Sequence, residues 1–263
     1  MPVAPVHSMR NRRPAPRRQR LRQLVIAMEL FCCVCVLAVF VYAFYHYTID
    51  SPRYKVKQIL VYGAVKVSPE QVRSAAGVTT EDNLLLVSTA AVSANVSELP
   101  YVAAADVSRE LPNTLVITLR ERAAVATVMA GRRVYLVDGA GFVLREIAPG
   151  APITGPLITS IPDLGIPVAG ERLASPALHE ALSLWQAFSE APVSTEITLS
   201  EIAAEGPMQL TMFWDEAPYE IRWGRSDYKR QAERLSVLWH EKQGELPCQE
   251  YLDLRFDQDL VCR

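Results

Sequence analysis

A long run of apolar residues close to the N-terminus constrains this chain more than any other feature. From Leu24 to Tyr45 the only charged side chain is Glu29, and from Leu30 onward every residue of the run is apolar or aromatic. A helix of about 22 residues spans roughly 33 Å, which is enough to cross a bilayer core about 30 Å thick. We therefore predict a transmembrane helix over residues 23–47.

The residues before this run are basic. Residues 1–22 hold four prolines, seven arginines and no Asp or Glu. This composition predicts a disordered tail, and the arginines keep it in the cytoplasm, so the helix acts as a signal anchor. The alternative is a cleaved signal peptide, whose apolar region would be shorter and followed by small residues rather than by the aromatic residues found here. The arginines are Arg10, Arg12, Arg13, Arg17, Arg18, Arg20 and Arg22.

The charge of the remaining chain is acidic. The whole sequence has 27 Lys and Arg against 29 Asp and Glu, and seven of the basic residues lie in the tail. A basic tail on an acidic body argues against a nucleic-acid-binding domain, so we expect no nucleic acid partner.

A small α+β module is expected over residues 54–122. Ser68, Pro69 and Glu70 form a helix start, and Gly77 ends that helix. The predicted order is β-α-α-β-β, with the helices covering one face of a three-stranded sheet. The expected strands are Lys55–Tyr62, Val102–Arg109 and Thr114–Glu121, and the second helix is Ser88–Leu99.

A larger, strand-rich domain with two helices is expected over residues 123–263, which makes the fold class α+β. A proline-rich stretch from Pro149 to Pro167 is predicted to be irregular or edge-like. The apolar residues Tyr228, Ala232, Leu235 and Trp239 recur at helical spacing, which is more typical of core packing than of a ligand site. The expected strands are Arg133–Asp138, Phe142–Leu144, Ile197–Ala203, Met208–Trp214, Tyr219–Trp223 and Tyr251–Phe256, and the helices begin at Ser175 and Ser226.

The five cysteines fall into two groups. Cys32, Cys33 and Cys35 lie in the apolar run, where they act as small apolar residues. Cys248 and Cys262 could form a disulfide in an oxidising compartment. The segment between them reads as one extended strand, which would hold them beyond bridging distance, so we expect two free thiols.

No pattern of a known catalytic class occurs in the sequence. None of the four histidines has a second ligand at metal-binding spacing, and no HExxH, G-x-S-x-G, P-loop or GxGxxG pattern is present. We therefore expect a non-enzymatic protein with no cofactor, no metal and no small-molecule substrate. A cell-wall hydrolase with paired carboxylates stays open as an alternative.

Several longer stretches resemble a known family. They are NLLLVS (83–88), LPYVAAADVSRELPNTLVITLRERAAVA (99–126), YLVDGAGFVL (135–144), GRSDYKRQAERL (224–235) and YLDLRF (251–256). Residues 54–122 resemble a POTRA domain, and the whole chain resembles the FtsQ/DivIB family of bacterial cell-division proteins. The stretches occur in the family's order, follow a tail and anchor of the family's type, and cover nearly all of the chain.

The resemblance implies a bitopic inner-membrane protein at the division septum, with its C-terminal domains in the periplasm. Such a protein scaffolds septal proteins and links early and late divisome components. The implied partners are FtsB-like and FtsL-like coiled-coil proteins, with further septal proteins at the POTRA-like module, and residues 123–263 would be the FtsQ-type β domain. The runner-up is a membrane-anchored POTRA chaperone for exported proteins.

The predicted mechanism is β-strand addition at a C-terminal edge strand, Tyr251–Phe256. Leu252 and Leu254 are expected to face the core. Arg255 is expected to pair with a partner carboxylate, and Phe256, matching the family's aromatic residue, to enter a partner pocket. The alternative is that these are ordinary outer-face residues. The candidate partner-binding residues are Tyr251, Asp253, Arg255 and Phe256.

Overall fold

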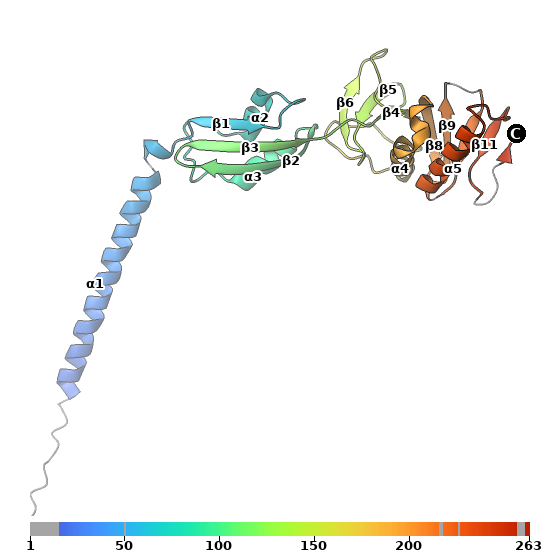
Figure 1. The fold of residues 1–263 in the computed structure, drawn as a ribbon. Coiled ribbons are helices and arrows are strands. Elements are labelled where there is room, and N and C mark those ends of the chain that lie inside the picture. The colour runs from blue at the N-terminus through green and yellow to red at the C-terminus, as the bar shows by residue number, and fades with distance from the viewer. Residues whose placement is uncertain (1–15, 50, 216–217, 226, 257–260) are drawn as a thin grey trace, which may run out of the picture.

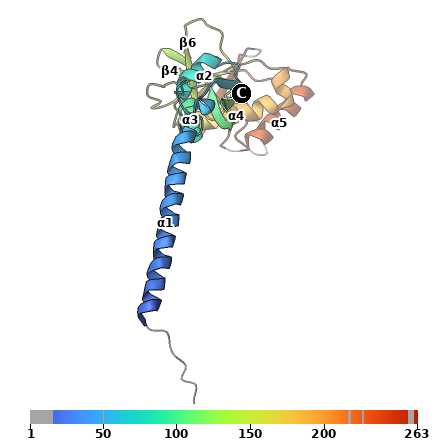
Figure 2. The same cartoon turned by 90° about the vertical axis from the view of Figure 1, so that its left-hand side faces the viewer.

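The computed structural model describes residues 16–49, 51–215, 218–225, 227–256 and 261–263. A single long helix projects away from the folded part of the chain in two perpendicular views (Figures 1 and 2). A small sheet with two helices follows it, and a larger strand-rich domain comes last, so that the C-terminus lies at the end farthest from the long helix (Figure 1). The predicted α+β class is confirmed.

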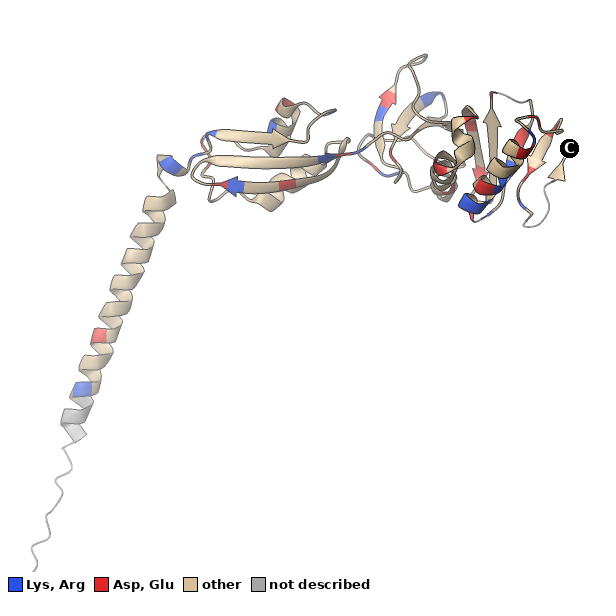
Figure 3. Ribbon diagram, viewed as in Figure 1, with Lys and Arg blue, Asp and Glu red and all other residues tan. Residues whose placement is uncertain are grey.

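The long helix, α1 (Pro16–Ile49), is exposed along its apolar run. Its stretch from Leu21 to Ile49 is long and apolar enough to cross a membrane, and none of it is buried against the rest of the chain. The charges drawn on its described part lie toward its N-terminal end (Figure 3). The helix extends beyond the predicted 23–47 on both sides.

The predicted disordered tail is only partly described. Residues 1–15 lie outside the described residues, whereas residues 16–22 are helical rather than disordered. Arg, Gln and Leu are good helix formers, and a proline is tolerated in the first turn, so the apolar helix continues backward into the basic segment.

The POTRA-like module has the predicted β-α-α-β-β order. Its sheet has the order β1-β3-β2, with β1 parallel and β2 antiparallel to β3. Val72 and Val96 from the two helices pack in one cluster with Leu115 and Ile117 of β3, which places both helices on the same face. The elements are β1 (Gln58–Tyr62), α2 (Pro69–Ala76), α3 (Thr89–Ser97), β2 (Val102–Glu110) and β3 (Thr114–Glu121), after a 3₁₀ turn at Pro52–Tyr54.

Local sequence signals set the ends of α2. Ser68 accepts a hydrogen bond from the amide of Gln71, whose side chain accepts one from the amide of Ser68, so two amides at the helix start are satisfied. Gly77 ends the helix at φ 63°, in the left-handed region that glycine adopts without strain.

The C-terminal domain is built on a nine-stranded mixed sheet with the order β12-β11-β10-β9-β8-β7-β4-β5-β6. Leu182 of α4 and Leu235 of α5 pack in one buried cluster with Ile202 and Met212, so both helices cover one face of the sheet. The elements are β4 (Ala126–Ala130), β5 (Arg133–Val137), β6 (Val143–Ile147), β7 (Leu157–Thr159), α4 (Pro176–Glu190), a 3₁₀ turn (Pro192–Thr195), β8 (Leu199–Gly206), β9 (Gln209–Trp214), β10 (Glu220–Trp223), α5 (Tyr228–Glu241), β11 (Tyr251–Asp253) and β12 (Val261–Cys262).

The proline-rich stretch contains a strand that the sequence did not indicate. β7 lies inside the sheet, parallel to both β4 and β8, although Pro149–Pro167 was predicted to be irregular or edge-like. Leu157, Ile158 and Thr159 keep their backbone donors because the prolines fall on either side of them. A three-residue strand is too short to show a period, so its place comes from long-range pairing.

The two cysteines outside α1 are bonded to each other, and the prediction of free thiols is wrong. Cys248 and Cys262 form a disulfide, with their Cα atoms 5.1 Å apart. The error came from treating the segment between them as one extended strand. β11 is only three residues long, and the chain returns as the antiparallel β12, which brings Cys262 back beside Cys248.

Candidate partner-binding edge

The strand predicted to form the edge of the sheet is covered on both sides. β11 pairs in parallel with β10 and antiparallel with β12, so the prediction that Tyr251–Phe256 is the terminal edge strand is wrong. The C-terminal return that forms the disulfide also adds one further strand. The sheet therefore ends at β12, and we call the outer side of Val261–Cys262 the docking edge.

The docking edge offers one backbone donor and one backbone acceptor. The amide of Arg263 donates to the carbonyl of Tyr251 at 3.1 Å, and the amide of Tyr251 donates back at 3.3 Å. In an antiparallel pair such bonded residues alternate with non-bonded ones. Cys262, which is paired with Leu252, therefore directs its N–H and C=O away from β11.

Two of the four candidate residues are paired with each other. Arg255 donates from Nε and Nη2 to Asp253, with its Nη2 2.5 Å from Oδ2. Asp253 is buried, while the Arg255 side chain is 48% exposed. Burial by itself would raise the pKa of Asp253, but the hydrogen bonds from Arg255 and the charges of Arg255 and Arg222 hold that pKa below its usual value. Arg255 is thus fixed by its own chain, and its Nη1 has no hydrogen-bond partner among the described residues.

Tyr251 is held by two residues that the sequence analysis did not single out. The guanidinium carbon of Arg222 lies 4.0 Å from the centre of the Tyr251 ring. Arg222 in turn lies 2.6 Å from a carboxylate oxygen of Glu220. The available sequence signal was the alternation of polar and apolar residues in β10, which predicts that Glu220 and Arg222 share the face opposite the helices.

Phe256 is half exposed next to this polar cluster. Its side chain is 50% exposed, and its carbonyl accepts a hydrogen bond from Nη1 of Arg234 on α5 at 2.8 Å. Arg255 also lines a hollow of about 320 Å³. It is lined mostly by polar residues, namely Glu205, Gln209, Thr211, Glu220, Arg222 and Arg255.

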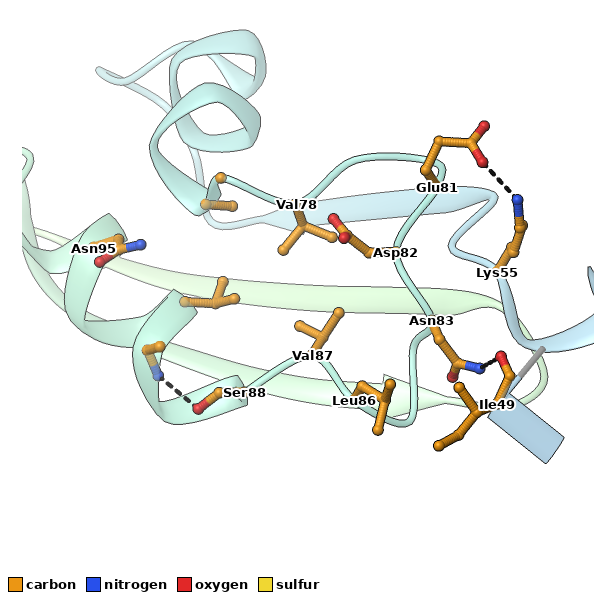
Figure 4. A pocket seen from close by; sticks show the side chains of 14 residues that line it. Ile49, Lys55, Val78, Glu81, Asp82, Asn83, Leu86, Val87, Ser88 and Asn95 are labelled. Carbon is orange, nitrogen blue, oxygen red and sulfur yellow. Dashed lines mark hydrogen bonds and ion pairs between the residues drawn. The ribbon is translucent and has the colours of Figure 1, made fainter. Parts of the chain in front are cut away.

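A second hollow, of about 720 Å³, lies where α1 meets the POTRA-like module (Figure 4). Asn83 donates from its side chain to the carbonyl of Ile49 at 2.6 Å, which ties the end of α1 to the module. Lys55 pairs with Glu81 at the rim, and Leu86 is 58% exposed. Glu81, Asn83 and Leu86 lie on the loop between α2 and α3, far in sequence from Ile49 and Lys55, so no local sequence pattern groups these residues.

The described part of the chain contains no cluster of three or more His, Cys, Asp or Glu side chains that could hold a metal ion. The docking edge and its neighbours present backbone groups, the exposed side chains of Arg255 and Arg263, and the half-exposed ring of Phe256. Arginine and aromatic residues are enriched in protein interfaces.

Models of two domain families match the chain in sequence. The FtsQ-type POTRA domain matches residues 54–122, and the C-terminal domain of the cell division proteins FtsQ and DivIB matches residues 126–255. The cell division protein FtsQ of Anaeromyxobacter sp. (strain K) is 30% identical over 226 residues, which cover 86% of this chain and 76% of that protein.

The chain belongs to the FtsQ/DivIB family of cell-division proteins.

Further relatives are also cell division proteins named FtsQ. The FtsQ of Geotalea daltonii is 26% identical over 84% of this chain and 80% of its own length. The FtsQ of Corynebacterium glutamicum is 29% identical over 67% of this chain and 74% of its own length. The FtsQ/DivIB C-terminal match ends at residue 255, so Phe256, β12 and Cys262 lie beyond the matched residues.

Proposed function

We propose that this FtsQ/DivIB family member is a bitopic inner-membrane scaffold of the division septum that binds its partners by strand addition at β12. In this proposal residues 1–22 are the cytoplasmic tail and residues 23–47 the anchor. Residues 54–122 and 123–263 are the POTRA and β domains on the periplasmic side. The role is non-enzymatic and links early and late divisome components.

The observation that carries the proposal is the position of β12. It ends the nine-stranded sheet, and Cys262 directs its backbone N–H and C=O outward. A partner segment in extended conformation can pair with these groups and with the flanking backbone, which adds a tenth strand. The edge also lies at the end of the molecule farthest from α1, where a partner anchored in the same membrane can reach it with an extended stalk (Figure 1).

Side chains near the edge supply the choice of partner. Arg255 is held in place by Asp253, so a partner carboxylate can pair with it without first ordering a flexible side chain. Phe256 adds an exposed ring that can enter an apolar pocket of the partner. Tyr251 and Asp253 are proposed to act indirectly, by positioning other side chains. Tyr251 contacts Arg222, and Asp253 binds Arg255.

The proposed partners are FtsB-like and FtsL-like coiled-coil division proteins. Membership of a cell-division family supports partners from the division machinery. Further septal proteins would bind the POTRA domain, where the hollow beside α1 offers a membrane-proximal surface.

The test is a binding titration with the full-length protein in lipid nanodiscs. The probe is the fluorescently labelled extracytoplasmic segment of the organism's FtsB-like protein. Removal of residues 257–263 deletes β12 and is expected to weaken binding about a hundredfold or more, and Phe256→Ala about tenfold. Val237→Ala changes an exposed apolar residue on α5 and serves as the control that leaves binding unchanged. Undiminished binding after the deletion, with the fold intact by circular dichroism, would place the interface elsewhere.

A further inference from the structure

The docking strand has almost nothing of its own to hold it in place. Val261 is 39% exposed, and Cys262 and Arg263 are also exposed, so β12 buries no apolar side chain. The described backbone of β12 pairs with β11. The next residue, Arg263, accepts hydrogen bonds at its carbonyl from the amides of Gln249 and Glu250, which precede β11, at 2.7 and 2.6 Å. A two-residue strand held by such contacts frays readily.

The disulfide supplies the missing attachment. Cys248 is only 7% exposed and belongs to the main buried cluster of the C-terminal domain. Its bond to Cys262 joins the exposed strand to that cluster across 14 residues of sequence. The other side-chain interaction described at this terminus is the ion pair of Arg263 with Glu250 at 3.3 Å, and both of its side chains are exposed. The disulfide is therefore what joins β12 to the buried cluster.

The same residue carries both the covalent link and the docking groups. Cys262 is the residue whose N–H and C=O face away from β11, and its side chain is bonded to Cys248. Fixing Cys262 therefore fixes the direction of the donor and acceptor that a partner strand would pair with. Loss of the bond frees this residue first.

We propose that Cys248 and Cys262 form an oxidation site for a disulfide-donating dithiol oxidoreductase outside the membrane, and that the bond is required for partner docking at β12. The inference rests on the proposed function for its docking half. The bond couples division-complex assembly to the oxidising state of the compartment, since a reduced chain has the same core but no fixed edge.

Cys248 and Cys262 would be oxidised by thiol–disulfide exchange with the donor. The thiolate of one cysteine attacks the donor's disulfide and forms a mixed disulfide, and one donor thiolate leaves. The thiolate of the second cysteine then attacks the mixed disulfide and displaces the donor's other sulfur. The two thiols of this chain lose two protons and two electrons in total, and the donor leaves as a dithiol. Disulfides of this kind form in the periplasm and are rare in the cytosol.

The test uses full-length protein in nanodiscs, in a background in which Cys32, Cys33 and Cys35 are changed to serine so that a reductant acts on one bond. Membranes are first solubilised in the presence of an alkylating agent, which blocks any free thiol. Cys248 and Cys262 are expected to remain unmodified until reductant is added. Alkylation of both residues without reductant would overturn the proposed oxidation site.

Amide hydrogen exchange then compares the oxidised protein, the reduced protein and Cys262→Ser. The amides of Gln249, Glu250 and Arg263, which pair β12 with its neighbours, are expected to exchange about tenfold or more faster without the bond. The control is Val237→Ser, which changes an exposed residue of α5, retains the disulfide and should leave exchange at these amides unchanged. Equal exchange in oxidised and reduced protein would overturn the inference whether or not a partner binds.

Binding of the labelled FtsB-like segment to the same samples separates the two proposals. In protein that keeps both Cys248 and Cys262, reduction is expected to weaken binding about tenfold. Reductant is expected to have no effect on binding by Cys262→Ser. If reduction speeds exchange at β12 but leaves binding unchanged, the bond holds the strand and the proposal that docking requires the bond is wrong. If the segment binds neither form, the proposed function fails, and the exchange result still decides whether the bond orders the strand.

Discussion

Arg122 donates from Nη1 to Oδ2 of Asp138 at 2.8 Å, and this ion pair joins the end of the POTRA domain to the turn between β5 and β6 of the C-terminal domain. The two side chains are 16% and 10% exposed. Arg122 also lies over the ring of Phe142, with its guanidinium carbon 3.6 Å from the ring centre. The other oxygen of Asp138 accepts hydrogen bonds from the amides of Ala140 and Phe142, so both carboxylate oxygens have hydrogen-bond donors.

A small apolar cluster supports this junction. Tyr101, from the POTRA domain, packs against Leu136, Leu144 and Ile147 of the C-terminal domain. The ion pair and the cluster together hold the two domains against each other, so the position of the docking edge relative to the POTRA domain is set by packed structure rather than by a free linker.

Arg122→Gln tests the junction. Since the mutation leaves a largely buried carboxylate without its cation, we expect the free energy of unfolding to fall by about 1–3 kcal/mol. Urea unfolding followed by tryptophan fluorescence measures it. The control is Arg133→Gln, which breaks an ion pair with Glu146 whose side chains are 65% and 47% exposed, and which should change stability by no more than about 1 kcal/mol. Equal effects of the two changes would contradict the role of Arg122.

Asp253→Asn tests whether the ion pair with Arg255 stabilises the fold. The pKa of Asp253 in the folded protein lies below its usual value despite burial, because Arg255 stabilises the charged form. A carboxyl group whose folded pKa is lowered stabilises the fold above its unfolded pKa of about 3.9, and that contribution is lost as the pH falls through the folded value. Wild type should therefore lose stability below about pH 4 more steeply than Asp253→Asn in urea titrations at successive pH values. Parallel profiles of stability against pH for wild type and Asp253→Asn would contradict a stabilising ion pair between Asp253 and Arg255.

Glu121 makes a similar contribution in the POTRA domain. One of its oxygens accepts the amides of Val65, Lys66 and Val67, each at 2.9 Å. Burial would raise its pKa, but these hydrogen bonds and the charge of Lys66 lower it overall. Glu121→Gln should accelerate amide exchange in residues 65–67 at neutral pH, with little change at β12. Unchanged exchange at these three amides would show that the carboxylate does not order the loop.

Gly155 and Gly131 separate backbone strain from steric overlap. Both have positive φ, +60° and +63°, but a Cβ on Gly155 would overlap the carbonyl oxygen of Val125, whereas nothing lies within 4 Å of one on Gly131. We expect Gly131→Ala to lower the free energy of unfolding by about 1 kcal/mol and Gly155→Ala by about 3 kcal/mol. Similar losses in urea unfolding would mean that the approach to Val125 relaxes without cost.

Features with local causes were predictable from the sequence. The helix at Ser68 and the hairpin around Leu111–Asn113 were found because caps and turn residues lie within a few positions of each other. The core stripe of α5 was found in the same way, and Tyr228, Ala232, Leu235 and Trp239 are all buried.

Features with long-range causes were not predictable. β7 and β12 are three and two residues long, and only their neighbours in the sheet define them. The disulfide was missed for the same reason, since it depends on β12 turning back. The pairing of Asp253 with Arg255 had a sequence signal, because residues two apart in a strand share a face, yet the resemblance pointed to a partner carboxylate instead.

The most direct test of docking at β12 is the exchange rate of one amide. In the free protein the N–H of Cys262 faces away from β11, while that of Arg263 is bonded to Tyr251. Site-resolved exchange is measured on the oxidised full-length protein with and without a saturating FtsB-like segment. The account predicts that binding slows exchange at Cys262 by about a hundredfold, with a smaller change at Arg263. Formation of the complex with no slowing at Cys262 would contradict strand addition at this edge.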